Sequence, residues 1–335
     1  MERAVRRPTV SVAISSYNSG PYAAIQLNSV LQQSVLPQQI VVGDDGSTDG
    51  TYETMRRIAD EATARGLPVR WTFLEPEHVG LRPNMVRIIA ACDQDVVVIA
   101  DHDDVCLPDR VERLQQSFAE RPELLYLHTD ADLIDPAGKP TGRTLMETQA
   151  VSAWEFEQYR RGEAFRVLVR RWMAVGAASG FRRTMVDLAG PIPDGWLYDG
   201  WFAQIAAALG RLDHLRATTV RYRVHPGNTV GVRRRGVVEK LRMLRAPGDR
   251  RNAALLARAE SVVHRLGQIR SDVPDWSYDL ACERLRHEQL RATLESNRLL
   301  RWPAVLREAR TGAYDRLGRG RKDVLLDLVQ PLPRS

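Results

Sequence analysis

The sequence has few cysteines and no long apolar run, and each absence excludes a class of protein. Its three cysteines, Cys92, Cys106 and Cys282, form no C-x-x-C pair, which argues against a disulfide framework or a zinc ribbon and favours a reducing compartment. The longest apolar runs, such as residues 96–100, are far shorter than the roughly 20 residues that span a membrane. Residues 1–7 lead into a proline with no apolar stretch behind them, so no secretory signal is expected. These absences predict a cytoplasmic protein.

Glycine and proline occur only at ordinary frequencies. With 23 glycines and 18 prolines among 335 residues, a collagen-like repeat is excluded. The hydrophobic fraction of 44% excludes disorder as the main state, because a chain of this length can bury a substantial core. By its length the chain should hold about two domains or one large α/β unit.

Short β-rich segments alternate with helical patterns in the first half of the chain. The predicted strands are 9–15, 39–43, 69–74, 95–100 and 124–129, and the predicted helices between them are 21–33, 52–65, 84–91 and 108–120. This alternation predicts an α/β fold with a mainly parallel sheet flanked by helices. After about residue 150 we expect strands at 172–181 and 218–224 and a helix at 198–209. Beyond residue 233 long helices dominate, so we place a boundary near residue 232.

Charge is distributed unevenly along the chain. The formal net charge is +6, but residues 231–335 hold 23 basic and 13 acidic side chains, a balance of +10, which leaves −4 for residues 1–230. The basic helices of this C-terminal region admit three interpretations: contact with anionic lipid headgroups, packing on the preceding domain or in a homodimer, and binding of nucleic acid. No nucleic-acid-binding signature supports the third, so we expect no such partner.

The most informative motif is Ala-Asp-His-Asp-Asp at residues 100–104, directly after the apolar fourth strand. In an open α/β sheet, ligands bind beyond the carboxyl ends of the strands. Three carboxylates within four residues repel one another, and a divalent cation such as Mg²⁺ or Mn²⁺ relieves that repulsion. The alternative is a solvated acidic turn that caps the next helix.

A second acidic turn, residues 44–50, follows the second strand. If strands one and two are parallel, this turn lies beside residues 15–18 at the same edge of the sheet. A carboxylate that accepts from a base N–H, next to a Tyr ring that can stack, would form a nucleoside pocket. An ordinary tight turn rich in Asp and Gly remains the alternative.

Several segments, in this order and spacing, resemble glycosyltransferase family 2. They read VAISSYN (12–18), SVLQQSV (29–35), VVGDDGSTDGT (41–51), GLRPN (80–84), ADHDDVCLPDRV (100–111), YDGWFAQIAAALG (198–210) and YRVHPGNTVG (222–231). The last two are most similar to bacterial rhamnosyltransferase-type members that build surface polysaccharides. The resemblance covers about 230 residues.

The resemblance implies a GT-A fold, the Rossmann-like sheet of nucleotide-sugar transferases. Residues 1–232 would form the catalytic domain, with a nucleotide-sugar half at about 1–130 and an acceptor half at about 131–232, followed by a basic helical region at 233–335. The implied reaction is transfer of a sugar, with rhamnose the first candidate, from a UDP, dTDP or GDP donor to a hydroxyl of a glycan or lipid-linked acceptor. A divalent metal, Mg²⁺ or Mn²⁺, and inversion at the anomeric carbon are implied as well, as is a location in the cytoplasm or at the inner face of the cell membrane.

Site residues follow from the same resemblance. The nucleotide-sugar contacts it implies are Ser15, Tyr17, Asp45, Arg82, Asn84 and Asp101. The implied metal ligands are Asp101, Asp103 and His225, and the implied catalytic base is Asp199. A base on the far face of the sugar agrees with single displacement and inversion.

Alternatives remain open at two of these residues. Asp199 also suits a carboxylate at a helix N-terminus, and His225, before Pro-Gly, suits an ordinary turn. Gly200 stands where relatives often have a second Trp, a difference that would loosen the acceptor side. Two other functions also remain: a sugar nucleotidyltransferase, which usually has a basic Gly-rich loop after strand one that this chain lacks, and a non-catalytic nucleotide-sugar-binding subunit.

Overall fold

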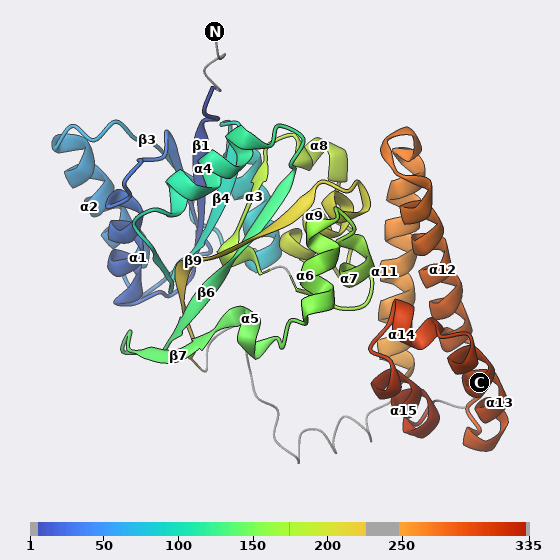
Figure 1. Cartoon of the computed structure of the whole chain (residues 1–335). Helices are drawn as coiled ribbons and strands as arrows, with labels where there is room; N and C mark the ends of the chain where they lie inside the picture. The colour runs from blue at the N-terminus through green and yellow to red at the C-terminus, as the bar shows by residue number, and fades with distance from the viewer. Residues whose placement is uncertain (1–5, 174, 226–247, 333–335) are drawn as a thin grey trace, which may run out of the picture.

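The computed structural model describes residues 6–173, 175–225 and 248–332. These residues form an α/β unit with a helical unit beside it (Figure 1). The boundary expected near residue 232, and the second half of the 222–231 motif, lie outside the described residues.

Nine strands among the described residues form one mixed sheet. Their order is β3-β2-β1-β4-β8-β6-β9-β5, and β7 pairs with β6. The strands are β1 (Val10–Ser16), β2 (Gln39–Asp44), β3 (Arg70–Phe73), β4 (Val96–Asp101), β5 (Val105–Cys106), β6 (Tyr126–Ile134), β7 (Pro140–Thr144), β8 (Ser179–Arg182) and β9 (Leu212–Arg223). The first four are parallel to one another, as the βα alternation predicted.

Helices connect and flank the strands. In the α/β unit they are α1 (Tyr22–Leu31), α2 (Thr51–Ala64), α3 (Leu81–Ala91), α4 (Arg110–Glu120), α5 (Leu145–Thr148), α6 (Ala153–Arg160), α7 (Phe165–Leu168), α8 (Met185–Ala189) and α9 (Tyr198–Ala208). In the helical unit they are α11 (Asp249–Gln268), α12 (Asp275–Ala292), α13 (Arg298–Arg310), α14 (Ala313–Leu317) and α15 (Arg321–Val329). None of these helices is long and apolar enough to cross a membrane.

Alternate residues of the central strands face opposite sides of the sheet, because successive side chains of a strand do so. Val10, Val12 and Ile14 pack in one core with α1, α2 and α4, whereas Ala13 and Val41 pack in the other with α3, α7 and α9. Both faces are therefore covered by helices. The carboxyl edge of the parallel strands is the part of the sheet left for a ligand.

The strand expected at 172–181 is wrong. Residues Gly176–Ala178 form a 3₁₀ turn, and the strand β8 begins only at Ser179. The N–H of Gly176 donates to the Oδ2 of Asp199 at 3.0 Å instead of joining a sheet ladder. A side chain at position 176 would also collide with Tyr198, since an added Cβ would lie 2.2 Å from its hydroxyl oxygen.

Candidate active site at the carboxyl edge of the sheet

The carboxyl ends of β1, β2 and β4 meet at one edge of the sheet. The register pairs Ser15 with Asp101 across β1 and β4, and Ser16 with Asp44 across β1 and β2. The Ser16 hydroxyl donates to the Oδ2 of Asp44 at 2.8 Å, and the N–H of Ser47 donates to its Oδ1 at 2.7 Å. The carboxylate of Asp44 is therefore used within the turn that follows β2. The next carboxylate at this edge that could contact a ligand is that of Asp45.

The motif after β4 gathers three carboxylates in a poorly solvated place. Burial, with Asp103 and Asp199 nearby, raises the pKa of Asp101 to about 7. Burial and the charges of Asp103 and Asp101 raise the pKa of Asp104 well above its usual value. Asp104 accepts from the N–H of Arg223 at 2.8 Å through Oδ1, whereas its buried Oδ2 has no partner among the described residues. Ionised carboxylates this close are destabilised unless a positive charge joins them.

His225 supplies a nitrogen to this cluster from the end of β9. Its Nε2 lies 2.8 Å from the Oδ2 of Asp103, and its ring stacks on Tyr22 with 5.9 Å between the centroids. Arg223 fixes the same corner, because its Nε donates to the backbone oxygen of Asp103 at 2.7 Å. The structure thus brings together two of the three predicted metal ligands.

The side chains of Asp101, Asp103 and His225 meet some, but not all, of the requirements for binding a hard divalent cation. Within the described ranges, no three His, Cys, Asp or Glu side chains converge closely enough to hold a metal ion by themselves. Mg²⁺ is usually held by one or two carboxylates and by phosphate oxygens of a substrate, so a complete protein cage is not required. Asp103 with His225, and the destabilised carboxylate of Asp101, are the groups that such an ion would contact.

Asp199 lies at the first turn of α9, and its carboxylate is buried. Its Oδ2 accepts from the N–H of Gly176 at 3.0 Å and its Oδ1 from the N–H of Gly200 at 2.7 Å. These two bonds lower its pKa, but burial outweighs them and raises the pKa to about 6. A carboxylate with such a pKa can hold or release a proton near neutral pH.

Asp45 lies where the second acidic turn approaches the loop before α3. Its Oδ1 accepts from the N–H groups of Val79 and Gly80, both at 2.8 Å, and its Oδ2 lies 3.2 Å from Nδ1 of His78. The ring of His78 stacks on Tyr17, with 5.1 Å between the centroids. Tyr17 is 46% exposed, so its outer face is open to a planar ligand.

Asn84 and Arg82 occupy different surroundings. The Asn84 amide is fully buried and donates to the Ser15 hydroxyl at 3.1 Å and to the Gly43 carbonyl at 2.8 Å. Arg82 pairs with Asp194 at 2.7 Å and donates to the Ile192 carbonyl at 2.6 Å. Asn84 therefore orients Ser15 from beneath the edge, and Arg82 holds the loop that leads to α9.

Sequence reasoning gave no individual role to three residues of this site: His78, Asp104 and Arg223. Asp104 was visible as the last carboxylate of its motif. Arg223 stands in the 222–231 motif but was assigned no role. His78 had no local signal, because only the fold brings its loop against Tyr17 and Asp45.

Trp172 fills the space above Gly200. A Cβ added at position 200 would lie 2.1 Å from the Trp172 ring, a distance that real contacts never reach. The glycine is therefore matched to an indole that comes from another segment. The looser acceptor side expected from Gly200 is not observed, since a large ring occupies that space.

Comparisons with known proteins agree with the expected family and fold. The model of a protein family described as Glycosyl transferase family 2 matches residues 11–188. An uncharacterized glycosyltransferase of Nostoc sp. is 27% identical over 226 residues, which cover 65% of this chain and 66% of that protein. The chondroitin synthase of Escherichia coli is 30% identical over 133 residues, which cover 40% of this chain and 18% of the synthase. The chain thus spans less than two thirds of each of these relatives.

Among solved structures, TarS of S. aureus, residues 1–349 in complex with UDP, is similar to this chain with a TM-score of 0.52 and 15% identity. The alignment covers 96% of this chain and 89% of that one. Likeness at this identity concerns the fold, and it confirms the expected nucleotide-sugar-transferase sheet with a helical region after it.

Proposed function

Since the chain belongs to glycosyl transferase family 2, we propose that it transfers a sugar from a nucleoside-diphosphate donor to a hydroxyl of a glycan or lipid-linked acceptor. One observation carries the proposal: the carboxylates of Asp101 and Asp103 lie at the carboxyl edge of the sheet, and Asp199 is near enough to raise the pKa of Asp101. A leaving-group site and a base are thus side by side. We also propose residues 1–232 as the catalytic domain and 233–335 as a separate helical region.

The donor would bind along the edge of β1, β2 and β4. Tyr17 offers an exposed ring face for the base. The Oδ2 of Asp45, which has only longer contacts to Gly80 N–H at 3.1 Å and to His78 Nδ1 at 3.2 Å, is the oxygen proposed to accept from a base N–H. Ser15 and Asp101 lie side by side where the ribose would follow. Asn84 and Arg82 would act on the donor indirectly. Asn84 positions the Ser15 hydroxyl, and Arg82 holds the loop that contains Asp194. The structural neighbour TarS was solved in complex with UDP, which supports a nucleotide-linked donor.

A divalent cation, Mg²⁺ or Mn²⁺, would be held by Asp103 and His225, with Asp101 beside it. When bound, such an ion neutralises charge on the departing diphosphate. The clustered carboxylates support this role, because burial and mutual repulsion raise the pKa values of Asp101 and Asp104, although the nearby Arg110 guanidinium lowers them in part.

Asp199 would act as the general base. It takes the proton from the acceptor hydroxyl as that oxygen forms a bond to the anomeric carbon and the bond from that carbon to the diphosphate oxygen breaks. The nucleoside diphosphate leaves with the electron pair, and attack from the opposite face inverts the anomeric carbon. The two backbone N–H donors of Asp199 fix its carboxylate for this step.

The acceptor is proposed to be a growing surface polysaccharide or its lipid-linked precursor, with rhamnose as the first candidate for the transferred sugar. The name of the relative chondroitin synthase supports polymer synthesis. The rhamnose assignment rests on the Y-D-x-W and Y-R-x-H-x-x-N elements, of which Tyr198–Trp201 and Tyr222–His225 are described.

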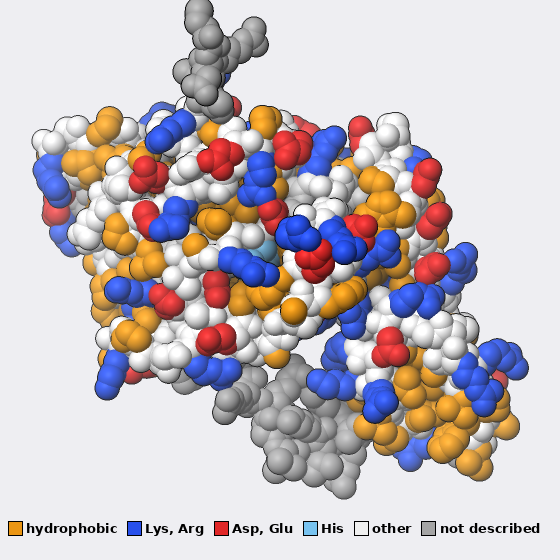
Figure 2. All heavy atoms as spheres, viewed as in Figure 1, with side chains coloured by type: hydrophobic (Ala, Val, Ile, Leu, Met, Phe, Trp, Pro, Cys, Tyr) orange, Lys and Arg blue, Asp and Glu red, His pale blue; other side chains and the backbone are white. Residues whose placement is uncertain are grey.

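The helical region would bring the enzyme to an anionic membrane surface. Six exposed apolar side chains of α13 and α15, here named the apolar patch, are Leu299, Leu300, Trp302, Leu306, Leu325 and Val329. Figure 2 shows hydrophobic side chains gathered there with Lys and Arg around them. Exposed basic residues of the same helices include Arg298, Arg307, Arg310, Arg321 and Lys322, whereas Asp323 and Asp327 are buried in ion pairs. An apolar surface with a basic rim suits anionic lipid headgroups.

The orientation of the apolar patch agrees with this role. β6 runs parallel to β4, so the β7 hairpin that follows β6 lies beyond the carboxyl edge of the sheet. In Figure 1, β7, α13 and α15 all lie toward the lower side of the molecule. The helices that carry the apolar patch and the carboxyl edge of the sheet thus lie toward the same side of the molecule.

A thermal-shift panel tests the donor assignment. UDP-, dTDP- and GDP-sugars are added with and without Mn²⁺, followed by a transfer assay with the donor that binds. We expect stabilisation by one nucleotide class, larger with Mn²⁺ than without. Binding without any transfer would favour a non-catalytic subunit, and no binding by any nucleotide sugar would overturn the proposed function.

A further inference from the structure

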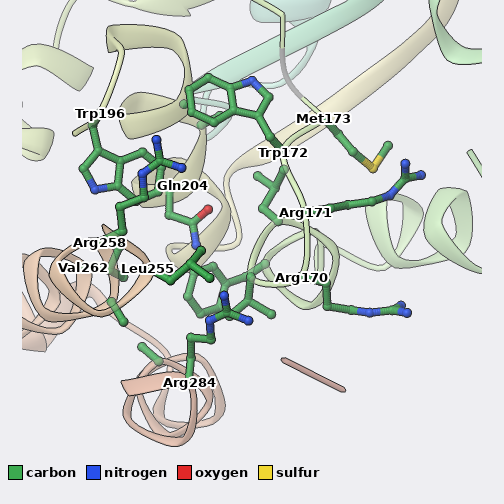
Figure 3. Close-up of a pocket in the computed structure, with 17 residues that line it drawn as sticks. Arg170, Arg171, Trp172, Met173, Trp196, Gln204, Leu255, Arg258, Val262 and Arg284 are labelled. Carbon is green, nitrogen blue, oxygen red and sulfur yellow. The ribbon is translucent and has the colours of Figure 1, made fainter. Parts of the chain in front are cut away.

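A cavity of about 120 Å³ lies between the α/β unit and the helical unit, outside the edge described above (Figure 3). Its walls come from residues 165–173, from the Gly200, Ala203 and Gln204 face of α9, and from α11 and α12. Engineered cavities of roughly 150 Å³ hold a benzene ring, so this volume suits part of a small ring compound. Gly200 lines the cavity and directly follows Asp199, which places the cavity next to the proposed base.

Gln204 is a polar group inside this cavity without a partner. The residue is only 7% exposed, and its amide makes no hydrogen bond within the described part of the chain. Figure 3 shows the amide pointing into the cavity. A side-chain amide can donate two hydrogen bonds and accept two. The amide is therefore available for a ligand.

The cavity is lined by cationic groups and by no acidic side chain among its described residues. Arg171 is committed to Glu155, and in Figure 3 Arg170 and Arg171 both turn away from the centre. Arg258 uses its Nε to donate to the Gly195 carbonyl at 2.9 Å, and its Nη groups make no hydrogen bond to a described residue. Burial lowers the pKa of Arg258, and no nearby acid raises it.

Arg284 adds a second positive charge from α12. Its Nη2 pairs with Glu288 at 2.6 Å, whereas its buried Nη1 has no described partner. Glu288 is shared, because Arg291 also lies 3.1 Å from it. The ion-pair cluster to which these residues belong holds four arginines and three acids, namely Arg251, Arg284, Arg291 and Arg319 with Glu288, Asp323 and Asp327. One positive charge is left in excess.

Two tryptophans give the cavity a rigid wall. The rings of Trp172 and Trp196 stack with 6.1 Å between their centroids, and the Trp196 N–H donates to the Ser261 hydroxyl at 3.0 Å. The Arg258 guanidinium lies over Trp196, with its Cζ 5.3 Å from the ring centroid. An apolar wall, a free amide and two guanidinium groups form a combination that matches a sugar ring bearing an anionic substituent.

We propose that this cavity binds an acidic sugar unit of the acceptor glycan, one that carries a carboxylate or a phosphate, through Gln204, Arg258 and Arg284. The assignment to the acceptor rests on the proposed function, whereas the binding itself does not. Asp199 and Gln204 are five residues apart on α9, roughly 7.5 Å along the helix axis at 1.5 Å per residue. At roughly 100° per residue the two side chains leave α9 about 140° apart, so an acceptor held in the cavity would have to extend past Trp172 to present a hydroxyl to Asp199.

Binding of defined probes to the full chain tests the proposal. Saturation-transfer NMR and calorimetry compare methyl β-glucuronoside, glucose 6-phosphate, the neutral methyl β-glucoside and inorganic phosphate. We expect one or both acidic sugars to bind at least tenfold more tightly than the neutral glucoside and than inorganic phosphate. Equal binding of the neutral sugar would overturn the anionic class, and equal binding of phosphate alone would overturn the sugar assignment.

Variants locate the binding. Gln204→Glu keeps the shape of the side chain and adds a negative charge, and Arg258→Met keeps the apolar stem. Both should weaken acidic-sugar binding at least tenfold, whereas Arg250→Met, an exposed arginine of the same helix, should not. Unchanged binding in both cavity variants would overturn the site. UDP and Mn²⁺ binding, measured on the same samples, reports folding and tests the donor site separately, so failure of either hypothesis leaves the other measurable.

Discussion

The Oδ2 of Asp103 lies 2.8 Å from Nε2 of His225, although 122 positions separate the two residues. This contact ties the end of β4 to the end of β9. Arg223 strengthens the connection through the backbone oxygen of Asp103 and through Asp104. The acidic motif and the histidine motif thus form one unit at the proposed cation site.

Replacement of Asp103 should remove the cation. We expect Asp103→Asn to weaken Mn²⁺ binding in the presence of a nucleoside diphosphate by at least tenfold and to abolish transfer, because a neutral amide is a poorer ligand than a carboxylate. Calorimetry with Mn²⁺ measures this. Asp109→Asn, at an exposed aspartate beside α4, is the matched control. Full transfer activity in EDTA would contradict the metal role.

The activity should depend on pH through Asp199. Because burial raises its pKa to about 6, the carboxylate is protonated and inactive as a base below that pH and becomes active as the pH rises through it. We expect kcat/KM to fall about tenfold per pH unit below pH 6. Asp199→Asn should lower transfer by about 10²-fold or more and remove this acid limb, with UDP binding unchanged. A pH profile that is unchanged in the variant would show that another group is the base.

A side chain at position 200 should disturb the acceptor side. Gly200→Ala places a Cβ 2.1 Å from the Trp172 ring, so the indole must move. We expect a loss of about 1–3 kcal/mol in the free energy of unfolding and a higher KM for acceptor, with the donor KM unchanged. Gly267→Ala, in α11 with no atom nearer than 3.8 Å to the added Cβ, is the control and should be tolerated. A double variant with Trp172→Ala should recover part of the stability loss if the two positions are coupled.

The apolar patch should bind anionic vesicles. The variant Leu299→Ser/Leu300→Ser/Trp302→Ser removes three exposed apolar side chains of α13, and we expect it to lose flotation with phosphatidylglycerol vesicles that carry the wild-type chain. Ile25→Ser/Val86→Ser, at exposed apolar positions of the α/β unit, is the control and should float. Wild-type binding should weaken as salt is raised. A wild-type dimer in light scattering that the patch variant disrupts, without vesicle binding, would assign the surface to a second copy instead.

Much of the site could be predicted from local patterns. The apolar strand β4 and the carboxylates directly after it stand together in the sequence, so their place at a sheet edge followed from the βα alternation. Asp199 was assigned from the family resemblance, and the helix predicted at 198–209 placed it at the first turn of α9. His78 could not be found, since nothing in residues 74–80 indicates that this loop folds over Asp45 and Tyr17. The 172–181 strand was wrong because its β-rich composition does not reveal that Gly176 donates to Asp199.

The sequence by itself determined the α/β order, the acidic edge and the family, because periodicity, strand ends and motifs are properties of contiguous residues. Only the tertiary structure decided which side chains from distant segments pack together, form ion pairs or remain without a partner. It placed Trp172 over Gly200, left Gln204 and Arg258 facing a cavity, and turned Asp323 and Asp327 inward toward Arg291 and Arg319. The physical reason is that burial and pairing depend on contacts between segments far apart in the chain, and these contacts set the pKa values, the free hydrogen-bonding groups and the net charge of each surface.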